Sequence, residues 1–451
     1  MQATKHYRVG LILTIFTVGA FITVLNQTLL FTAFPKIMAT FAVSASTVQW
    51  LTTAYMLVNG VLIPVTAFLI GRYTTRQLTL FAIGAFTIGT LGSGLATSFS
   101  MLLIARLIQA IGAGILVPLM QVVMFTIVDK NKRGSIMGLI GLATAFAPAI
   151  GPTLSGVIVN SLSWRFLFWL VLPIAGILLI MTIFGMQNVG SVNRALKLDY
   201  PSVLLSTLGF GLLLYGTGIV NQSSAIGLLL IVVGLGLIAL FIHRQTKLTQ
   251  PMLEFRVFKN RQFTLSLLLV VLSFIALMGP QTTIPTLIQS AMHQSALTSA
   301  LVLLPGAIAN GVAALIAGRL FDRFGGKVLA IVGSVVIMVS MVPYIFINTQ
   351  TSLIVLSGFF ILTMIGNSLI MMPLMTAGLN ALPEHWLTHG TAMMNTFRQM
   401  GGSIGIGVLV SIQTVFGVNS QFLGARALFG GVMLVGIISL VMALMLDRQR
   451  H

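Results

Sequence analysis

The sequence has 451 residues, of which 57% are hydrophobic and 7% are charged. A soluble globular protein carries about 25% charged residues, so this composition excludes a water-soluble fold. The net charge of +18 could suggest nucleic-acid binding, but the basic residues lie in short segments between apolar runs, as in membrane-protein loops. The absence of cysteine excludes disulfides, thiolate metal sites and iron–sulfur clusters.

Long apolar runs occupy most of the chain. A helix needs about 20 apolar residues to cross a bilayer, and continuous runs without polar alternation exclude a β-barrel. We therefore predict an all-α membrane protein with fourteen transmembrane helices. The first run follows Lys5 and Arg8 as in a signal peptide, but it is too long and lacks a small-residue cleavage site, so we interpret it as a retained span. The predicted spans are 9–31, 47–70, 78–97, 101–127, 135–160, 165–186, 202–220, 225–242, 263–284, 296–317, 328–347, 351–378, 390–415 and 425–446.

The Lys and Arg residues fall mainly on one side of this span map. Nineteen lie on the side of the chain ends, three lie on the other side, and two lie within spans. Because cytoplasmic loops carry the excess of basic residues, both termini are predicted to be cytoplasmic. One missed helix would invert every later loop and remove this asymmetry. The three outer residues are Lys36, Arg165 and Arg426, and the two within spans are Arg106 and Arg398.

Two charged loops, 187–201 and 243–262, flank a pair of spans that contain no ionisable residue. This pattern predicts two six-helix halves with a helix pair inserted between them. The expected units are an N-terminal six-helix bundle at 1–190, an inserted helix pair at 191–245 and a C-terminal six-helix bundle at 246–451.

An internal repeat supports this division. Segment 67–76 aligns with segment 318–327 at an offset of 251 residues, with Arg72 matching Arg323 and Arg76 matching Lys327. The repeat matches the second span of each half when the inserted pair is skipped. Repeats of this kind are typical of secondary transporters.

Five sequence motifs, each at the expected span or loop, resemble those of one known family. They are Gly318-x-Leu-x-Asp322-Arg323-x-Gly325-x-Lys327 in a loop, Arg106-x-x-Gln109 in span four, Pro148-x-x-Gly151-Pro152-x-x-x-Gly156 in span five, the segment from Trp164 to Pro173, and Asn395-x-x-Arg398 in span thirteen. Together they resemble the major facilitator superfamily, in particular its fourteen-span EmrB/QacA branch near the lincomycin-resistance exporters. The resemblance implies a major facilitator fold and the export of lipophilic compounds, usually drugs, in exchange for protons.

Arg106 and Arg398 are the candidate residues for substrate binding or coupling. A charge at the bilayer centre costs about 2.5–3.5 kcal/mol, so such residues usually face a cavity or a partner. Gln109 shares a helix face with Arg106, and Asn395 lies one turn before Arg398. The alternative is that each arginine only fixes helix packing. Asn26 and Gln27, which lie in the first span, could likewise line a cavity or bond between helices.

Two further motifs are candidates for gating. Pro148, Gly151, Pro152 and Gly156 could form a bent, closely packed helix that seals against leak, or only a passive kink. Asp322 could form a cytoplasmic charge network with its neighbouring cations near span eleven, or lie in an ordinary solvated loop. The cations around it are Arg319, Arg323 and Lys327, and the first-half copy of the motif has Gly71 in place of the acid.

The six acidic residues bear on coupling, because all of them map to cytoplasmic loops or the tail. Proton antiport normally uses a carboxylate buried in the membrane. Relatives carry an aspartate in the first span, whereas this chain has Leu25-Asn26-Gln27-Thr28, and asparagine cannot titrate. The remaining titratable candidates are His293, His385 and His389. The acids are Asp129, Asp199, Glu254, Asp322, Glu384 and Asp447.

These observations favour a proton-linked exporter of lipophilic small molecules in a bacterial cell membrane. An uncoupled lipid or glycolipid flippase, and a non-transporting sensor or scaffold, remain as alternatives. No phosphate-binding G-x-x-x-x-G-K-[ST] loop, metal cluster or nucleophile–histidine–acid set is found, so we predict a non-enzymatic protein without cofactor or metal. The expected partners are the substrate, protons as coupling ion and the lipid bilayer, and we expect a monomer.

Overall fold

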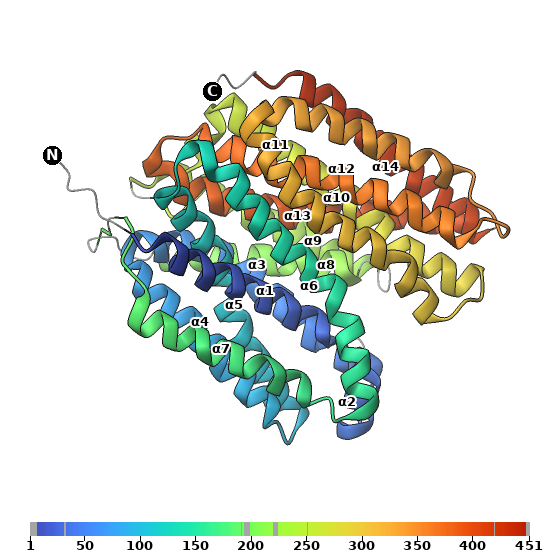
Figure 1. Ribbon diagram of the computed structural model, residues 1–451, viewed down its shortest axis with the longest axis horizontal. Helices are drawn as coiled ribbons and strands as arrows, with labels where there is room; N and C mark the ends of the chain where they lie inside the picture. The colour runs from blue at the N-terminus through green and yellow to red at the C-terminus, as the bar shows by residue number, and fades with distance from the viewer. Residues whose placement is uncertain are drawn as a thin grey trace.

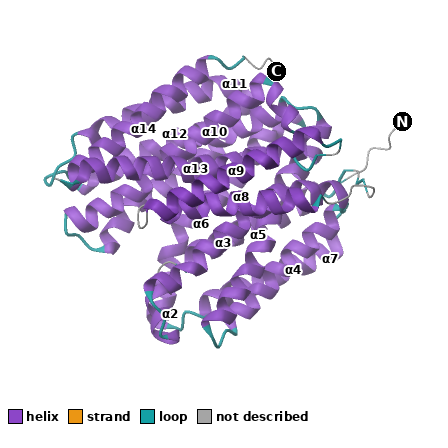
Figure 2. Cartoon of the chain, turned by 180° about the vertical axis from the view of Figure 1, so that it is seen from behind, coloured by secondary structure: helices purple, strands orange, loops and turns teal. Residues whose placement is uncertain are grey.

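A computed structural model describes residues 7–30, 33–190, 192–193, 199–219, 224–249, 251–418 and 420–447. Throughout these residues the regular structure is helical, as the apolar runs predict (Figure 1, Figure 2). The N-terminal part contains α1 (Val9–Leu29), α2 (Phe34–Phe41), α3 (Ala45–Arg72), α4 (Thr75–Gly94), α5 (Phe99–Ile127), η2 (Lys130–Lys132), α6 (Arg133–Ser161) and α7 (Phe166–Gly185). The remainder contains α8 (Tyr200–Ile219), α9 (Ser224–Lys247), η3 (Phe255–Lys259), α10 (Arg261–Thr286), η4 (Leu287–Ala291), α11 (Ala296–Ile345), α12 (Leu353–Asn380), η5 (Glu384–Trp386), α13 (Leu387–Gly417) and α14 (Gln421–Leu444).

Hydroxyl side chains define where several of these helices begin. Thr74 accepts the backbone N–H of Gln77, whose side chain bonds back to Thr74 in a capping box at the start of α4. Ser98 caps α5, and Ser295 caps α11. Each cap satisfies a backbone donor that the first helical turn leaves free, so the helices start directly after short polar turns.

Ten helices in the described residues are long and apolar enough to cross a membrane, or eleven if the bent pair within α3 counts as one span. The two parts of α3, Trp50–Leu62 and Pro64–Arg72, meet at 51°. Proline removes a backbone hydrogen bond and clashes with the preceding turn, which accounts for a bend at Pro64. The chain is therefore a multi-pass helical membrane protein.

The segment 318–327, which was predicted to separate two spans, contains a break between two helices. α11 has 50 residues and consists of two helices that join across a kink at Gly325, its non-helical position. Gly325 has φ of 76°, which is accessible to glycine at little cost. The left-handed residue turns the chain sharply, so no further loop residues are needed.

The helices pack as two groups (Figure 1). In the first group α4 and α3 pack on α5, and α1 packs on α6 and α7. In the second, α12 and α14 pack on α11, while α10 packs on α12, α13 and α14. The groups meet where α6 contacts α11 and where α3 contacts α13, and α8 lies against α3, α9 and α13.

The start of α1 and the end of α14 lie at the same end of the molecule (Figure 1, Figure 2). We call this end, where α1 begins and α14 ends, the chain-end face. The outward surface carries many exposed apolar side chains, among them Phe184 at 84% and Val232 at 65% exposure. A soluble monomer rarely exposes apolar patches on this scale, so the surrounding medium is lipid.

Candidate functional site

Arg106 is the centre of a polar cluster inside the first helix group. Its guanidinium Nη1 donates to the side-chain oxygen of Asn26 on α1 and, at 2.9 Å, to Oε1 of Gln109. The Gln109 amide donates in turn to Thr90 on α4 at 2.7 Å. The Arg106 guanidinium carbon lies 4.3 Å from the centre of the Tyr55 ring on α3. Four helices thus converge on one arginine.

Glycines bring α4 and α5 close enough for this cluster to form. A Cβ atom at Gly89 would come within 2.6 Å of the Ala105 carbonyl oxygen, and one at Gly112 would overlap the Ala82 carbonyl. Backbones in such contact are typical of small-residue packing in membranes. The close approach places Gln109 within reach of Thr90.

The environment of Arg106 is enclosed and lacks acids. Arg106 and Gln109 are fully buried, and Asn26 is 1% exposed. Among the described residues, the Nε and Nη2 groups of Arg106 have no hydrogen-bond partner. A buried cation bound to neutral oxygens and an aromatic ring has no opposite charge beside it, which matches an anionic or strongly hydrogen-bond-accepting partner.

Arg398 lies in a second cluster, which joins the two helix groups. The Asn395 amide on α13 donates to Gln121 on α5 at 2.6 Å, and Arg398 donates to the Asn395 oxygen at 3.3 Å. The Arg398 guanidinium carbon lies 5.4 Å from the Phe274 ring centre on α10. Gln121 lies within the predicted span 101–127, but no pattern in the sequence indicates that its side chain contacts Asn395.

Several other polar residues in the spans bond between helices. Ser273 on α10 donates to Asn367 on α12 at 2.6 Å, and Ser368 on α12 donates to the Asn310 carbonyl on α11 at 2.9 Å. These polar side chains therefore form hydrogen bonds between helices. Gln27 is partly buried on α1, beside Asn26.

Asp322 has different partners from those expected. Its carboxylate accepts the backbone N–H groups of Gly134 and Ser135, at 3.0 and 2.8 Å, and the Ser135 hydroxyl. It therefore binds the start of α6 rather than forming a charge network near span eleven. The physical reason is that a helix N-terminus presents free N–H groups and partial positive charge.

The other cations of this motif also bind elsewhere. Lys327 donates to the Leu444 carbonyl at 2.8 Å, and the Arg323 guanidinium carbon lies 5.2 Å from the Phe324 ring centre. Gly318 contacts α6 so closely that a Cβ atom at Gly134 would come within 2.7 Å of its carbonyl oxygen. The motif therefore joins α11 to α6 at the chain-end face.

The first-half copy of the motif contacts the segment after α7. The Arg76 backbone N–H donates to Asn188 at 3.1 Å, and its guanidinium donates to the Ile183 carbonyl at 2.6 Å. The Asn193 N–H donates to the carbonyl of Gly71, the residue that stands where the acid would be. Arg72 is the last residue of α3.

The span-five motif lies on α6. A Cβ atom at Gly151 would collide with the Thr28 side chain, so α6 and α1 are closely packed there. The backbone at Pro148, Pro152 and Gly156 is helical, and the surroundings of these three residues lie outside what the structure describes.

All six acids lie outside the central parts of the helices, as expected. Asp129, Asp199 and Glu254 immediately precede η2, α8 and η3. Asp322 lies three residues before the Gly325 break. Glu384 is in η5, and Asp447 follows α14.

A hollow of about 520 Å³ lies between the far ends of α10 and α13, away from the chain-end face. Its lining is rich in hydroxyl and amide groups, and it includes part of the π-helical turn η4. The polar residues around it are Thr282, Thr286, Ser290, Gln413, Thr414 and Gln421.

Comparison with known proteins gives consistent matches. The family model of the Major Facilitator Superfamily matches residues 16–406. The uncharacterized MFS-type transporter YcnB of Bacillus subtilis is 48% identical over 413 residues, which cover 91% of this chain and 87% of that protein. The lincomycin resistance protein LmrB of Listeria monocytogenes is 38% identical over 406 residues, which cover 89% of this chain and 86% of that protein. The crystal structure of the human organic anion transporter MFSD10 shares the fold, with a TM-score of 0.71 at 15% identity over 97% of this chain and 100% of that chain.

Proposed function

Because the chain belongs to the Major Facilitator Superfamily, we propose that it is a secondary transporter that exports lipophilic small molecules by alternating access. The observation that carries this proposal is the closure of one end of the molecule. Asp322 of α11 binds the start of α6, and Arg133 donates to Asn380 on α12 at 2.6 Å. Such contacts hold the two groups together in one state and must break when the groups rock apart.

The proposed topology has fourteen spans with cytoplasmic chain ends. At about 1.5 Å per residue, α11 would be about 75 Å long, far beyond the hydrocarbon thickness of about 30 Å. The Gly325 break therefore divides it into two spans. The residues placed outside support this assignment, since Arg165 and Arg426 donate to the carbonyls of Ala96 and Ile347 at the far end.

The proposed units follow this topology, with bundles at 1–190 and 246–451 and the inserted pair at 191–245. The contacts of α8 with both α3 and α13 support a role for this pair at the seam between the halves. The place in the EmrB/QacA branch is part of the same proposal, supported by the similarity to a lincomycin resistance protein.

In the proposed mechanism the two arginine clusters bind substrate or transmit its binding. The residues proposed for this role are Asn26, Arg106, Gln109, Asn395 and Arg398, which lie in the clusters, and Gln27, which lies next to Asn26 in the sequence. The tight α6–α1 contact at Gly151 would limit leak along α6, together with Pro148, Pro152 and Gly156.

Two coupling modes are compatible with this site. Exchange for protons is the mode that the family resemblance implies. Uncoupled flipping of a lipid or glycolipid is favoured by one observation: Asn26, which cannot titrate, occupies the position beside Arg106.

Transport in proteoliposomes under two imposed pH gradients tests the proposal. A proton-linked exporter should move lipophilic drugs faster when the gradient favours proton entry, and protein-free vesicles are the control. Flux that is independent of the gradient would favour the uncoupled alternative. Absence of flux for drugs and for fluorescent lipids would contradict both.

A further inference from the structure

A second hollow, of about 610 Å³, opens at the chain-end face beside the end of α9. Its walls are the last turn of α9 with Gln245 and Thr246, and the η3 segment with Arg256 and Lys259. We call it the α9–η3 hollow. Its lining includes no residue of the arginine clusters or of the contact between Asp322 and α6.

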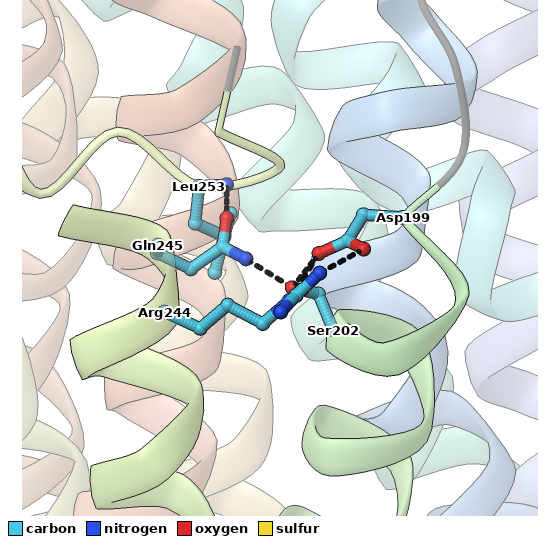
Figure 3. A network of polar contacts seen from close by, with 5 residues as sticks. All are labelled: Asp199, Ser202, Arg244, Gln245 and Leu253. Atoms are coloured by element: carbon cyan, nitrogen blue, oxygen red, sulfur yellow. Dashed lines mark hydrogen bonds and ion pairs between the residues drawn. The ribbon is translucent and has the colours of Figure 1, made fainter. Parts of the chain in front are cut away.

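A hydrogen-bonded network fixes one wall of this hollow (Figure 3). The Gln245 amide donates to Ser202 on α8 at 2.6 Å, and its oxygen accepts the Leu253 N–H at 3.1 Å. Next to it, Arg244 donates to both oxygens of Asp199, at 2.7 and 2.8 Å. The end of α9 is thereby bonded to the start of α8 and to the segment that leads into η3, so the wall is preformed.

The charges around the hollow leave a net positive potential. Glu254 is paired with Arg256 at 2.9 Å, so these two charges cancel. Asp199 is likewise paired with Arg244. Lys259 is exposed and, within the described residues, has no ion-pair partner, and the same holds for Lys247 at the end of α9. The hollow therefore matches a ligand with one or two negative charges.

The rest of the lining is apolar. Phe255 and Phe258 stack with ring centres 6.1 Å apart, and Leu248 and Pro251 complete the apolar part. Aromatic rings beside basic residues are typical of the membrane–water interface. The hollow borders α9, whose exposed apolar side chains, such as Leu240, offer a path for an acyl chain.

From this combination we propose that the α9–η3 hollow binds the phosphate headgroup of an anionic phospholipid from the leaflet at the chain-end face. Lys259 attracts the phosphate, the aromatic pair holds the glycerol region, and the acyl chains lie along α9. The bound lipid would stabilise the attachment of α9 to η3. This role does not depend on the substrate or on the coupling mode.

Lipid binding to the purified full-length protein tests the proposal. Melting temperature and retained lipid, by native mass spectrometry, are compared in phosphatidylglycerol and in phosphatidylcholine. Phosphatidylglycerol should raise the melting temperature and remain bound. Lys259→Gln should weaken that binding about fivefold, because it removes the unpaired basic side chain of the hollow that attracts the phosphate. Thr246→Glu, which places an acid in the exposed wall, should weaken it further.

The matched control is Lys132→Gln, because Lys132 is an exposed basic residue of η2 at the same face but outside the hollow. It should bind phosphatidylglycerol like the unmodified protein. Equal retention by Lys259→Gln, or equal stabilisation by phosphatidylcholine, would overturn the proposal. Equal stabilisation by inorganic phosphate alone would also overturn it, since a free anion rather than a lipid would then be the ligand. Transport is not measured, so failure of the proposed function would leave these results unaffected.

Discussion

The side-chain amide of Asn395 on α13 donates a 2.6 Å hydrogen bond to the amide oxygen of Gln121 on α5. Both side chains are buried, and the bond crosses from one helix group to the other. The Asn395 oxygen also accepts from Arg398, so the arginine of the second half is bonded directly to a residue at the seam. In the proposed mechanism, substrate binding at Arg398 would therefore change the contact between the two helix groups.

Gln121→Leu should lower the population of the state described here. It keeps the side-chain size but removes the bond to Asn395, and a buried hydrogen bond contributes about 1 kcal/mol, which corresponds to a change of about fivefold. Because the chain has no cysteine, spin labels can be placed cleanly at Ser161→Cys and Ser290→Cys, on exposed residues of the two halves. In Gln121→Leu, the distribution of distances between the two labels should show a second population, which corresponds to the state in which the two helix groups have moved apart at the seam.

Gln413→Leu is the control for this experiment. Gln413 also accepts a side-chain hydrogen bond, but its partner Thr283 belongs to the same helix group. It should leave the distance distribution unchanged. Identical distributions for Gln121→Leu and the unmodified protein would show that the seam bond does not bias the two states.

Asp322→Ala should loosen the chain-end face. The substitution leaves the N–H groups of Gly134 and Ser135 without their charged acceptor, and hydrogen bonds to charged groups contribute about 1.5–3 kcal/mol. Hydrogen–deuterium exchange of the peptide covering the first turn of α6 should accelerate at least tenfold. Asp129→Ala, at an exposed acid of the same face, is the control. Unchanged protection in Asp322→Ala would mean that glycine packing alone holds the two helices.

Local patterns predicted the helices and the pairing of neighbours, but not the contacts between distant segments. The three-residue spacing of Arg106 and Gln109 predicts a shared face, and their side chains meet at 2.9 Å. The contact of Arg106 with Asn26 spans 80 positions and depends on how α1 packs on α5. No periodicity encodes such a contact.

The partners of Asp322 were predicted wrongly for the same reason, because they are distant in the sequence. Composition alone suggested pairing with the nearest cations, whereas the free N–H groups at the start of α6 lie 187 and 188 positions away. The boundary between two spans at 318–327 was predicted but its form was not, because glycine in a basic segment indicates a loop as readily as a single left-handed residue between two helices.

Asn26→Asp should make transport depend on pH. It places a titratable carboxyl beside Arg106, where the amide oxygen now accepts from the guanidinium. Drug flux into acid-loaded and alkali-loaded proteoliposomes should then differ at least severalfold more than for the unmodified protein. Gln27→Glu, which adds an acid one residue further along α1, is the control and should change the gradient response less. An unchanged profile for Asn26→Asp would locate coupling elsewhere in the chain.

The Asp199–Arg244 pair should contribute to stability in a pH-dependent way. The Arg244 guanidinium bonded to Asp199 holds the pKa of that carboxyl below its ordinary value. A group whose pKa is lowered by folding stabilises the folded state fully above its unfolded value of about 4, and this stabilisation is lost as the pH falls through the folded value. Because the pair is largely exposed, water screens the attraction, and its contribution to stability should be small.

Thermal unfolding of Asp199→Asn and the unmodified protein at pH 7 and at pH 3 measures this contribution. The variant should melt at a lower temperature at pH 7, because it lacks the charge that Arg244 binds, and the difference should become smaller as the pH is lowered, because the native carboxyl then takes up a proton. Asp447→Asn removes an exposed acid at the same face and should show no such pattern. A constant difference between Asp199→Asn and the unmodified protein at both pH values would mean that the hydrogen bond from the Ser202 hydroxyl at the start of α8, rather than the ion pair with Arg244, accounts for the contribution of Asp199.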